Sequence, residues 1–246
     1  PLVRGEAIMG SAFTEPDAGS DLAAASTTAT KDGDEYVING SKIFITNGTR
    51  ASYLLCFAQT DPDNSDRHRR HSIIMVETDR EGFEANRLTG KLGMHAADTA
   101  EVYFDNVRVP CSNLIGELGK GFKEAMYLFN INRIVVAAQA VGIARSALEE
   151  SIKHAKKRIV FGAPLASYQV TQFKIADMFT WIEGGRNMMY KTAWKIDNGH
   201  IDHKLIAATK AFCGPMAVRC TDMALQLHGG YGYLAEYKVQ RLYRDV

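Results

Sequence analysis

The sequence predicts an α+β protein with two domains, a β domain over residues 1–119 and a helical domain over residues 120–246. In the first half, short runs of β-branched and aromatic residues alternate with Gly, Asn and Asp turns, which is typical of an all-β sandwich or barrel. Beyond residue 119, apolar residues recur every three or four positions, which is the period of a helix. Hydrophobic residues make up 46% of the 246 positions, enough for a sizeable core.

The β domain is expected to contain seven strands. A hairpin turn over residues 31–35 and a turn at Asn39-Gly40 separate the first three. The charged segment 61–71 is interpreted as a solvated hairpin loop. His68 and His71 within it lack an evident carboxylate or Cys partner, so no metal site is expected. The predicted strands cover residues 23–30, 36–38, 42–46, 53–59, 72–77, 83–87 and 101–109.

The helical domain is expected to contain three long helices and a short fourth. Their ends follow from local signals: Gly162-Ala163-Pro164 breaks the first, Asn198-Gly199 caps the second, and Gly229-Gly230 stops the third. Helices of this length must bury apolar faces against each other, so an antiparallel bundle is expected. The predicted ranges are about 122–158, 167–197 and 202–228, with the fourth helix beginning near Glu236.

Charge and cysteine content restrict the classes of partner. Lys plus Arg (29) nearly balances Asp plus Glu (28), so no strong field favours nucleic acid. No unbroken apolar run reaches the roughly 18 residues of a membrane span, and no membrane insertion is expected. Four cysteines without metal-ligand spacing indicate reduced thiols in an intracellular protein. We therefore expect the cytoplasm of a prokaryote or the mitochondrial matrix of a eukaryote.

Residues 14–21, Thr-Glu-Pro-Asp-Ala-Gly-Ser-Asp, form the most informative stretch. Pro16 fixes one backbone angle and Gly19 lets the chain approach a ligand closely. Successive N–H groups beside the Ser20 hydroxyl predict a nest that binds an anion.

A second stretch, residues 39–48, is expected to include a strand that carries an aromatic ring and a hydroxyl on one face. Phe44 and Thr46 are two residues apart, and alternate residues of a strand share a face. A phosphate cradle beside such a strand suits a flavin nucleotide. The alternatives are a surface turn beside an ordinary hairpin and, for Phe44 alone, an aromatic of the core.

These two stretches, together with residues 105–110 and 226–232, resemble the acyl-CoA dehydrogenase family in order and spacing. The resemblance runs from about Gly10 to Asp245. It implies an acyl-CoA dehydrogenase-like fold, a middle β-barrel domain followed by a C-terminal antiparallel helix bundle, and an FAD cofactor. In the family a helical N-terminal domain precedes this region and another helix follows it. The resemblance therefore implies a fragment that lacks both.

The resemblance assigns FAD contacts in both halves of the chain. Ser20 would sit at the pyrophosphate, Phe44 on the isoalloxazine face, and Thr46 near flavin N5. Arg158, in an R-x-x-F-G motif, would approach the pyrophosphate of a neighbouring subunit's FAD, which implies a homotetramer. The alternative for Arg158 is a cation that complements a helix C-terminus. The implied cofactor-binding residues are Phe13, Thr14, Gly19, Ser20, Phe44, Ile45, Thr46, Arg158, Phe161, Gln169, Gln226, Gly229 and Gly230.

The implied reaction is α,β-dehydrogenation of an acyl-CoA thioester, with electron-transferring flavoprotein as the electron acceptor. Ser20, Asn130 and Arg133 would contact the substrate, although a lone Arg there could instead serve as a partly buried salt-bridge partner. The resemblance places the catalytic Glu beyond Val246. The alternative base position is Asn132, whose amide is not basic, so no catalytic residue is assigned. An acyl-CoA oxidase or flavin monooxygenase of this fold and a non-catalytic acyl-CoA- or flavin-binding homologue remain alternatives.

Overall fold

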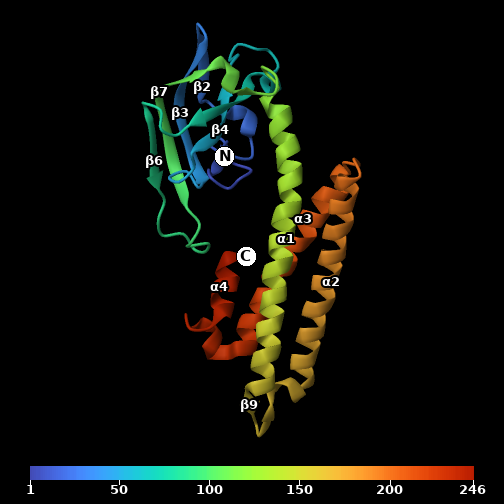
Figure 1. Ribbon diagram of the computed structural model, residues 1–246. Coiled ribbons are helices and arrows are strands. Elements are labelled where there is room, and N and C mark those ends of the chain that lie inside the picture. The colour runs from blue at the N-terminus through green and yellow to red at the C-terminus, as the bar shows by residue number, and fades with distance from the viewer. The chain divides into compact units, whose positions relative to one another are not determined.

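The computed structural model describes residues 1–246 and contains two compact units (Figure 1). The β unit comprises residues 1–91 and 95–127, and the helical unit comprises residues 92–94 and 128–246. The first helix, α1 (Gly121–Lys157), runs through the division near residue 127. The expected domain boundary at residue 119 remains a prediction.

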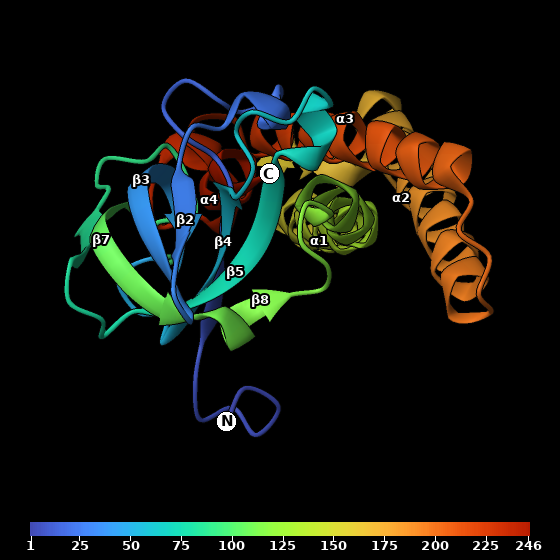
Figure 2. The same cartoon turned by 90° about the horizontal axis from the view of Figure 1, so that it is seen from above.

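The β unit is built on one eight-stranded sheet, whose central strands are seen in Figure 2. Its strands follow the order β6-β7-β3-β2-β4-β5-β8, and β1 pairs with β4 in parallel. No pairing joins the two end strands, β6 and β8, so the predicted barrel is not closed. The strands are β1 (Met9–Ala12), β2 (Thr28–Asp32), β3 (Glu35–Thr46), β4 (Tyr53–Gln59), β5 (His71–Glu77), β6 (Phe83–Arg87), β7 (Thr99–Pro110) and β8 (Leu114–Ile115).

Two local predictions in the β unit are wrong. The strand expected over residues 23–30 begins as a 3-10 turn, Leu22–Ala24, and becomes β2 only at Thr28. The turn expected at Asn39-Gly40 does not form, because β3 continues through it. Gly40 has a φ of 147°, and a Cβ there would lie 2.5 Å from the Thr27 hydroxyl oxygen. Glycine thus allows β3 to pass close to the preceding segment.

The charged segment 61–71 is only partly the solvated loop that was predicted. Arg67–Arg69 forms an exposed 3-10 turn, whereas His71 is the first residue of β5 and is fully buried. The chain contains no cluster of three or more potential His, Cys, Asp or Glu metal ligands.

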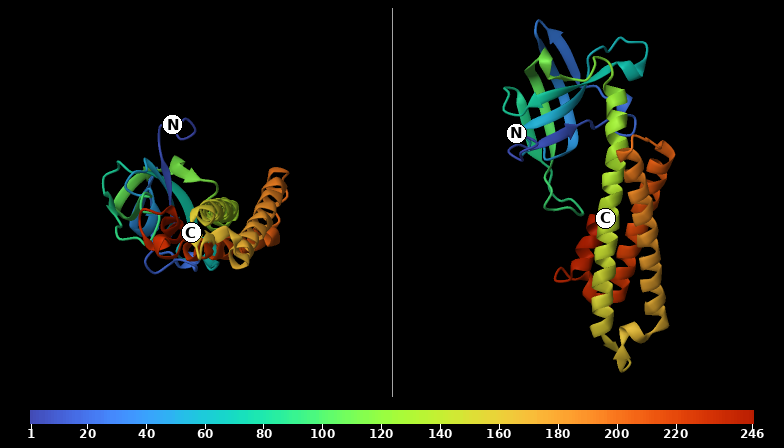
Figure 3. Two further views of the ribbon diagram at one scale, coloured as in Figure 1. Left: turned by 90° about the horizontal axis from the view of Figure 1, so that it is seen from below. Right: turned by 45° about the vertical axis from the view of Figure 1, so that its right-hand side comes forward.

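The helical unit confirms the predicted helices and their ends. The Asp202 carboxylate caps α3 by accepting a hydrogen bond from the Leu205 N–H at 3.1 Å. Gly199 and Gly229, which follow α2 and α3, both have positive φ. Figure 3 shows these helices lying lengthwise beside each other. The elements are α1, hairpin strands β9 (Ile159–Val160) and β10 (Ala163–Pro164), α2 (Gln169–Asp197), α3 (His203–His228) and α4 (Lys238–Asp245).

The core of the helical unit is lined by small side chains of α1, including Ala137, Ala144 and Ala147, which pack with α2, α3 and α4 residues. One helix, α1, is long and apolar enough to cross a membrane by length and composition alone, although core helices of other proteins meet the same test. The four cysteines are free, and burial raises the pKa of Cys56 and of Cys220 to about 11, which keeps both thiols protonated and unreactive.

Candidate functional site

The polar turn after β1 is closed by its own backbone. Glu15 N–H donates to Ala18 O at 2.9 Å, and Ala18 N–H donates to Glu15 O at 3.2 Å. These two N–H groups are therefore not free for a ligand, so the predicted nest does not extend over the whole turn. Gly19 and Ser20 are exposed, and their N–H groups donate to no protein atom. A Cβ at Gly19 would meet nothing within 4 Å. Two free N–H donors and a hydroxyl remain available to an anion.

A buried ion pair holds this turn against β3 and β4. Lys42 is 1% exposed, and its Nζ donates to Phe13 O at 3.1 Å, to the Glu15 carboxylate at 2.8 Å and to Phe57 O at 2.6 Å. Lysine is rarely buried this fully unless it is paired. The three acceptors satisfy all three donors of the ammonium group. Lys42 therefore joins the turn to two strands of the sheet.

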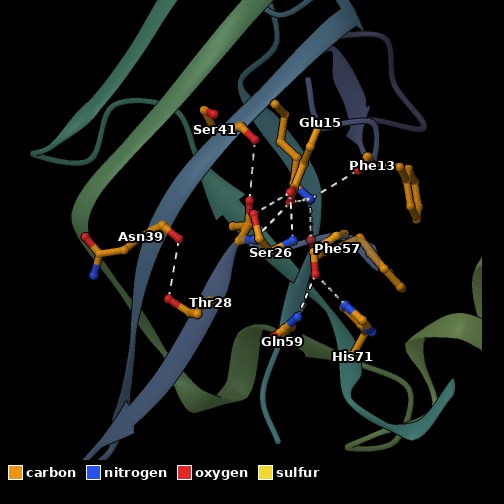
Figure 4. A network of polar contacts seen from close by, with 12 residues as sticks. Phe13, Glu15, Ser26, Thr28, Asn39, Ser41, Phe57, Gln59 and His71 are labelled. Carbon is orange, nitrogen blue, oxygen red and sulfur yellow. Dashed lines mark hydrogen bonds and ion pairs between the residues drawn. The ribbon is translucent and has the colours of Figure 1, made fainter. Parts of the chain in front are cut away.

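Glu15 joins the same turn to the start of β2. One carboxylate oxygen accepts hydrogen bonds from Ser26 N–H at 2.7 Å and from the Ser26 hydroxyl at 2.8 Å, and the other accepts from Thr27 N–H at 2.9 Å. Figure 4 shows Glu15 and Ser26 side by side in this network. Burial raises the pKa of Glu15, but the charge of Lys42 and these hydrogen bonds outweigh that effect and lower the pKa to about 2. The carboxylate is therefore ionised at neutral pH.

A second set of contacts fixes the chain at Ala25. Its carbonyl oxygen accepts from Gln59 Nε2 at 2.7 Å and lies 2.9 Å from His71 Nε2. The imidazole of His71 stacks on Phe57 at 4.4 Å, and Phe57 also packs against Phe13. Burial lowers the pKa of His71, so the ring is neutral and donates through Nε2. Its Nδ1 is buried without a partner.

Strand β3 becomes irregular at the residues predicted to face the flavin. Lys42 pairs with Val102 and Ile45 pairs with Ala100, so two β3 residues oppose one residue of β7. Phe44 lies in this bulge with a φ of 61° and is 65% exposed. Thr46 is also exposed, whereas Ile45 is buried between them. Both residues are exposed, so the core alternative for Phe44 is wrong, whereas their shared face stays a prediction because the bulge interrupts the alternation of the strand.

The segment after Thr46 is held by a second buried carboxylate, Asp98. Its side chain accepts from Thr49 N–H at 2.9 Å, and its backbone carbonyl accepts from Asn47 N–H at 3.1 Å. The Asp98 side chain is 3% exposed. These bonds fix the chain directly after β3, so Phe44 and Thr46 are followed by a segment held in place.

In the helical unit, a cavity of about 380 Å³ brings together four of the predicted cofactor residues. Arg158 follows the last residue of α1, and its N–H donates to His154 O at 2.9 Å. A Cβ at Gly229 or Gly230 would meet no atom within 4 Å, so a ligand can approach the backbone there. The predicted residues in the lining are Arg158, Gln226, Gly229 and Gly230.

The other two predicted cofactor residues of this unit lie outside the cavity lining. Phe161 is at the tip of the β9–β10 hairpin, where it is 95% exposed. Phe161 and Gly162 both have positive φ, 50° and 79°, as a type I′ turn requires. Gln169 is exposed at the first position of α2. An exposed Phe with positive φ is unusual, and such strain is concentrated at binding sites.

Three aromatic residues of the cavity were not predicted. The rings of His154 and His228 stack at 4.2 Å, and Tyr231 lies 5.7 Å from the Arg158 guanidinium carbon. Burial lowers the pKa of His154, and the neighbouring His228 and Arg158 lower it further. His154 and Arg158 are four residues apart at the end of one helix, a spacing that could have paired them from sequence.

The predicted substrate residues on α1 contact each other. Arg133 donates to the Asn130 side-chain oxygen, and the Asn130 amide nitrogen lies 3.2 Å from His203 Nδ1. Arg133 forms no ion pair with a carboxylate of the helical unit. Asn132 is exposed.

Both units of the chain match domains of one known family. Residues 10–107 match the middle domain of acyl-CoA dehydrogenases, and residues 119–246 match their C-terminal domain. The chain belongs to the acyl-CoA dehydrogenase family. The family is FAD-dependent. The residues present fit that cofactor, because free N–H donors, an exposed aromatic ring, and a cavity with a guanidinium and open glycines are all available.

Individual relatives cover the whole chain. The 3-(aryl)acrylate reductase of Clostridium sporogenes is 41% identical over 246 residues, which are 100% of this chain and 65% of the relative. The crystal structure of an acyl-CoA dehydrogenase from Geobacillus kaustophilus superposes with a TM-score of 0.97 at 42% identity, over 99% of this chain and 64% of that one. A structure solved in work on the electron transferring flavoprotein of Acidaminococcus fermentans has a TM-score of 0.96 at 40% identity, with the same coverage. The chain thus spans just under two thirds of the length of these relatives.

Proposed function

We propose that this chain is part of an FAD-dependent enzyme that dehydrogenates the Cα–Cβ bond of an acyl-CoA thioester. The observation that carries this proposal is the arrangement in the β unit, where the turn with free donors is hydrogen-bonded to the strand bearing the exposed Phe44. Ile43 N–H donates to Thr14 O at 2.9 Å, so turn and strand are direct neighbours. Membership of the family supports the same reaction.

The residues of the β unit would hold the flavin end of FAD. Gly19 and Ser20 N–H groups and the Ser20 hydroxyl would bind phosphate or carbonyl oxygens. The ring of Phe44 would cover one face of the flavin, and the Thr46 hydroxyl would hydrogen-bond near its N5 position. The side chains of Phe13 and Ile45 are buried, so these two residues would complete this side through backbone atoms, beside Thr14. When bound, FAD accepts the two electrons and the hydrogen that leave the β-carbon of the substrate.

The helical-unit residues would hold the FAD of a neighbouring subunit in a homotetramer. Arg158 offers a planar guanidinium, which suits bidentate binding of phosphate. Gln226, Gly229 and Gly230 would lie against the adenosine, and the exposed Phe161 and Gln169 would extend this surface. Exposed apolar side chains on α2, such as Phe173 and Trp194, support an interface between subunits.

The acyl-CoA would contact Ser20, Asn130 and Arg133. Loss of the α-proton needs a positioned base, and Asn132 cannot act as one because its amide is not basic. The β-oxidation role, electron-transferring flavoprotein as acceptor and the cytoplasmic or mitochondrial location are further proposals. The structure matched from work on that flavoprotein supports the acceptor.

A second candidate is the reverse reaction, reduction of an α,β-unsaturated acyl group. The relative from Clostridium sporogenes, named as a reductase of 3-(aryl)acrylates, favours it. The same flavin site serves both directions, because only the electron donor and acceptor are exchanged.

The test uses the intact protein. We expect it to purify yellow with about one FAD per subunit, and a matching acyl-CoA thioester to bleach the flavin anaerobically. Bleaching by saturated thioesters supports the dehydrogenase, and reoxidation of chemically reduced flavin by enoyl or arylacrylyl thioesters supports the reductase. Absence of both reactions with bound FAD would indicate a non-catalytic homologue, and rapid reoxidation by O₂ would indicate an oxidase or monooxygenase.

A further inference from the structure

We propose that the buried Lys42–Glu15 pair is a positioning device for the flavin, and that it sets the distance between the donors of the polar turn and the exposed face of β3. Both side chains are buried, so the pair would act on a bound flavin through the residues it holds. This inference rests on the proposed function, because it concerns how the same site is built.

The pair closes the segment that carries the free donors at both of its ends. At the near end, Lys42 Nζ binds Phe13 O at 3.1 Å and the Glu15 carboxylate at 2.8 Å. At the far end, the Glu15 carboxylate binds Ser26 and Thr27 at 2.7 to 2.9 Å. Gly19 and Ser20 lie between these two ends and make no backbone hydrogen bonds of their own. The Glu15–Ala18 backbone bonds and the Asp21–Arg67 ion pair flank these two residues, and the Lys42–Glu15 pair ties the segment that carries them to β3 and to the start of β2.

The pair also acts at the point where β3 turns irregular. Lys42 is the last residue before the bulge, and Phe44 follows two positions later with a φ of 61°. The intervening Ile43 donates its N–H to Thr14 O at 2.9 Å. Two consecutive residues of β3 thus bind the turn immediately before the exposed aromatic. A change at Lys42 moves the turn and Phe44 relative to each other.

A role in stability alone would not require this geometry. A buried ion pair is often replaceable by apolar side chains of similar volume without loss of folding. The lysine also binds the carbonyl of Phe57 on β4 at 2.6 Å, so its position is fixed from three directions. We therefore expect that a neutral replacement of both partners leaves a folded protein with an altered flavin site.

The experiment compares the double variant Glu15→Gln/Lys42→Met with the wild-type intact protein. Both new side chains have nearly the same length as the originals, and no charge is left unpaired. We expect the Kd for FAD to rise about 10- to 100-fold, the scale of lost hydrogen bonds to a charged group. The visible absorption band and the midpoint potential of the bound flavin should both shift, because the ring and its donors change their spacing.

The matched control is Val107→Ala. Val107 lies on β7, pairs with Ile38 of β3 and is buried in the core of the β unit, so the substitution removes buried volume there. It should lower stability and leave the flavin band and potential at wild-type values. The single variant Glu15→Gln serves if the double variant does not fold. Its amide oxygen keeps an acceptor for either Ser26 or Thr27, and Lys42 keeps its bonds to Phe13 O and Phe57 O, so it should shift the same signals less.

The results distinguish a positioning role from a purely stabilising one. A folded double variant or Glu15→Gln variant with wild-type Kd, absorption band and potential would overturn the positioning role. Equal shifts in Val107→Ala would reduce the pair to a stabilising element and would also overturn it. A wild-type protein that binds no FAD would refute the proposed function, and this would be seen before any variant is compared.

Discussion

In the β unit the exposed ring of Phe44 is backed by a buried ion pair, whereas in the helical unit the exposed ring of Phe161 is carried by a two-residue hairpin turn. The β unit buries the charged side chains Glu15, Lys42 and Asp98. The helical unit buries no Asp, Glu, Lys or Arg side chain. Both units present an aromatic ring at positive φ, but only one uses buried charge to do so.

The difference follows from how each kind of element satisfies polar groups. In the helical unit, the buried hydroxyls of Thr192, Thr209 and Thr221 each donate to the carbonyl four residues earlier. In the β unit, Lys42 and Glu15 are 27 residues apart in sequence. These buried hydroxyls of the helical unit are therefore satisfied within their own helices, whereas the buried charges of the β site depend on one long-range pair.

The largest expected effect is a loss of stability that tests the difference between the two units. Lys42→Met leaves the Glu15 carboxylate buried and unpaired, so it should destabilise the β unit by about 3–5 kcal/mol. Thr209→Val removes one side of the buried hydroxyl contact with Thr192 in the helical unit, and it should cost only about 1 kcal/mol. Chemical denaturation of both variants measures the difference. Equal losses of unfolding free energy would show that the buried ion pair stabilises its unit no more than the buried hydroxyl contact does.

Acid should act on the β unit through the same pair. The pKa of Glu15 is lowered from 4.5 to about 2, so the stability it contributes is complete above pH 4.5 and is lost as the pH falls to 2. This amounts to about 3 kcal/mol. His71 also contributes stability that is lost as the pH falls, but this loss begins at a higher pH. The pKa of His71 is lowered in the folded protein, so the unfolded chain binds the histidine proton before the folded protein does.

Unfolding free energies measured through this range should therefore fall steeply in the wild-type protein. Glu15→Gln should keep the part of the slope due to His71 and, below pH 4.5, lose the contribution of Glu15 while keeping that of other carboxylates with a lowered pKa, such as Glu77. An unchanged slope in Glu15→Gln would contradict the assignment to this carboxylate.

The sequence predicted the helical unit better than the β unit, and for a physical reason. The ends of α2 and α3 at Gly199 and Gly229 were predicted from local signals and are confirmed, and the Asp202 carboxylate caps the start of α3. The bulge at Phe44 depends on the register against β7, which lies more than fifty residues away. No local signal in the sequence reports such a pairing.

The same limit applied to the candidate site. Lys42 and Phe44 are two residues apart, yet Lys42 is buried and Phe44 is exposed, because the bulge interrupts the alternation of β3. The burial of Lys42 also contradicts what its charge suggests. The stacking of His154 on His228 joins α1 to the end of α3, so it too depends on tertiary structure.

A smaller effect concerns the cavity of the helical unit. Arg158→Ala should weaken FAD binding by about 10- to 100-fold, because a phosphate would lose a charged hydrogen-bond donor. Arg145→Ala is the control, since Arg145 lies on α1, the helix that ends just before Arg158, but is exposed and pairs with Glu149 at 2.9 Å. Flavin retained on dialysis is the measurement. Equal retention by the two variants would refute the role of Arg158.

The smallest effect separates strain from binding at the tip of the hairpin. Phe161 has a φ of 50°, a conformation that costs a non-glycine residue about 1 kcal/mol or more. Asn tolerates this conformation, and Asn followed by Gly is the preferred pair in a type I′ turn. Phe161→Asn places Asn before Gly162, so it should raise the free energy of unfolding by about 1 kcal/mol.

The same substitution should weaken FAD retention several-fold, because the 95% exposed ring would be lost from the surface proposed to bind the cofactor. Thermal unfolding and dialysis of one sample give both numbers. If Phe161 binds the cofactor at the expense of stability, the free energy of unfolding should rise while FAD retention falls. A variant that is less stable would mean that the turn is not strained, and a more stable variant with unchanged FAD retention would mean that Phe161 does not bind the cofactor.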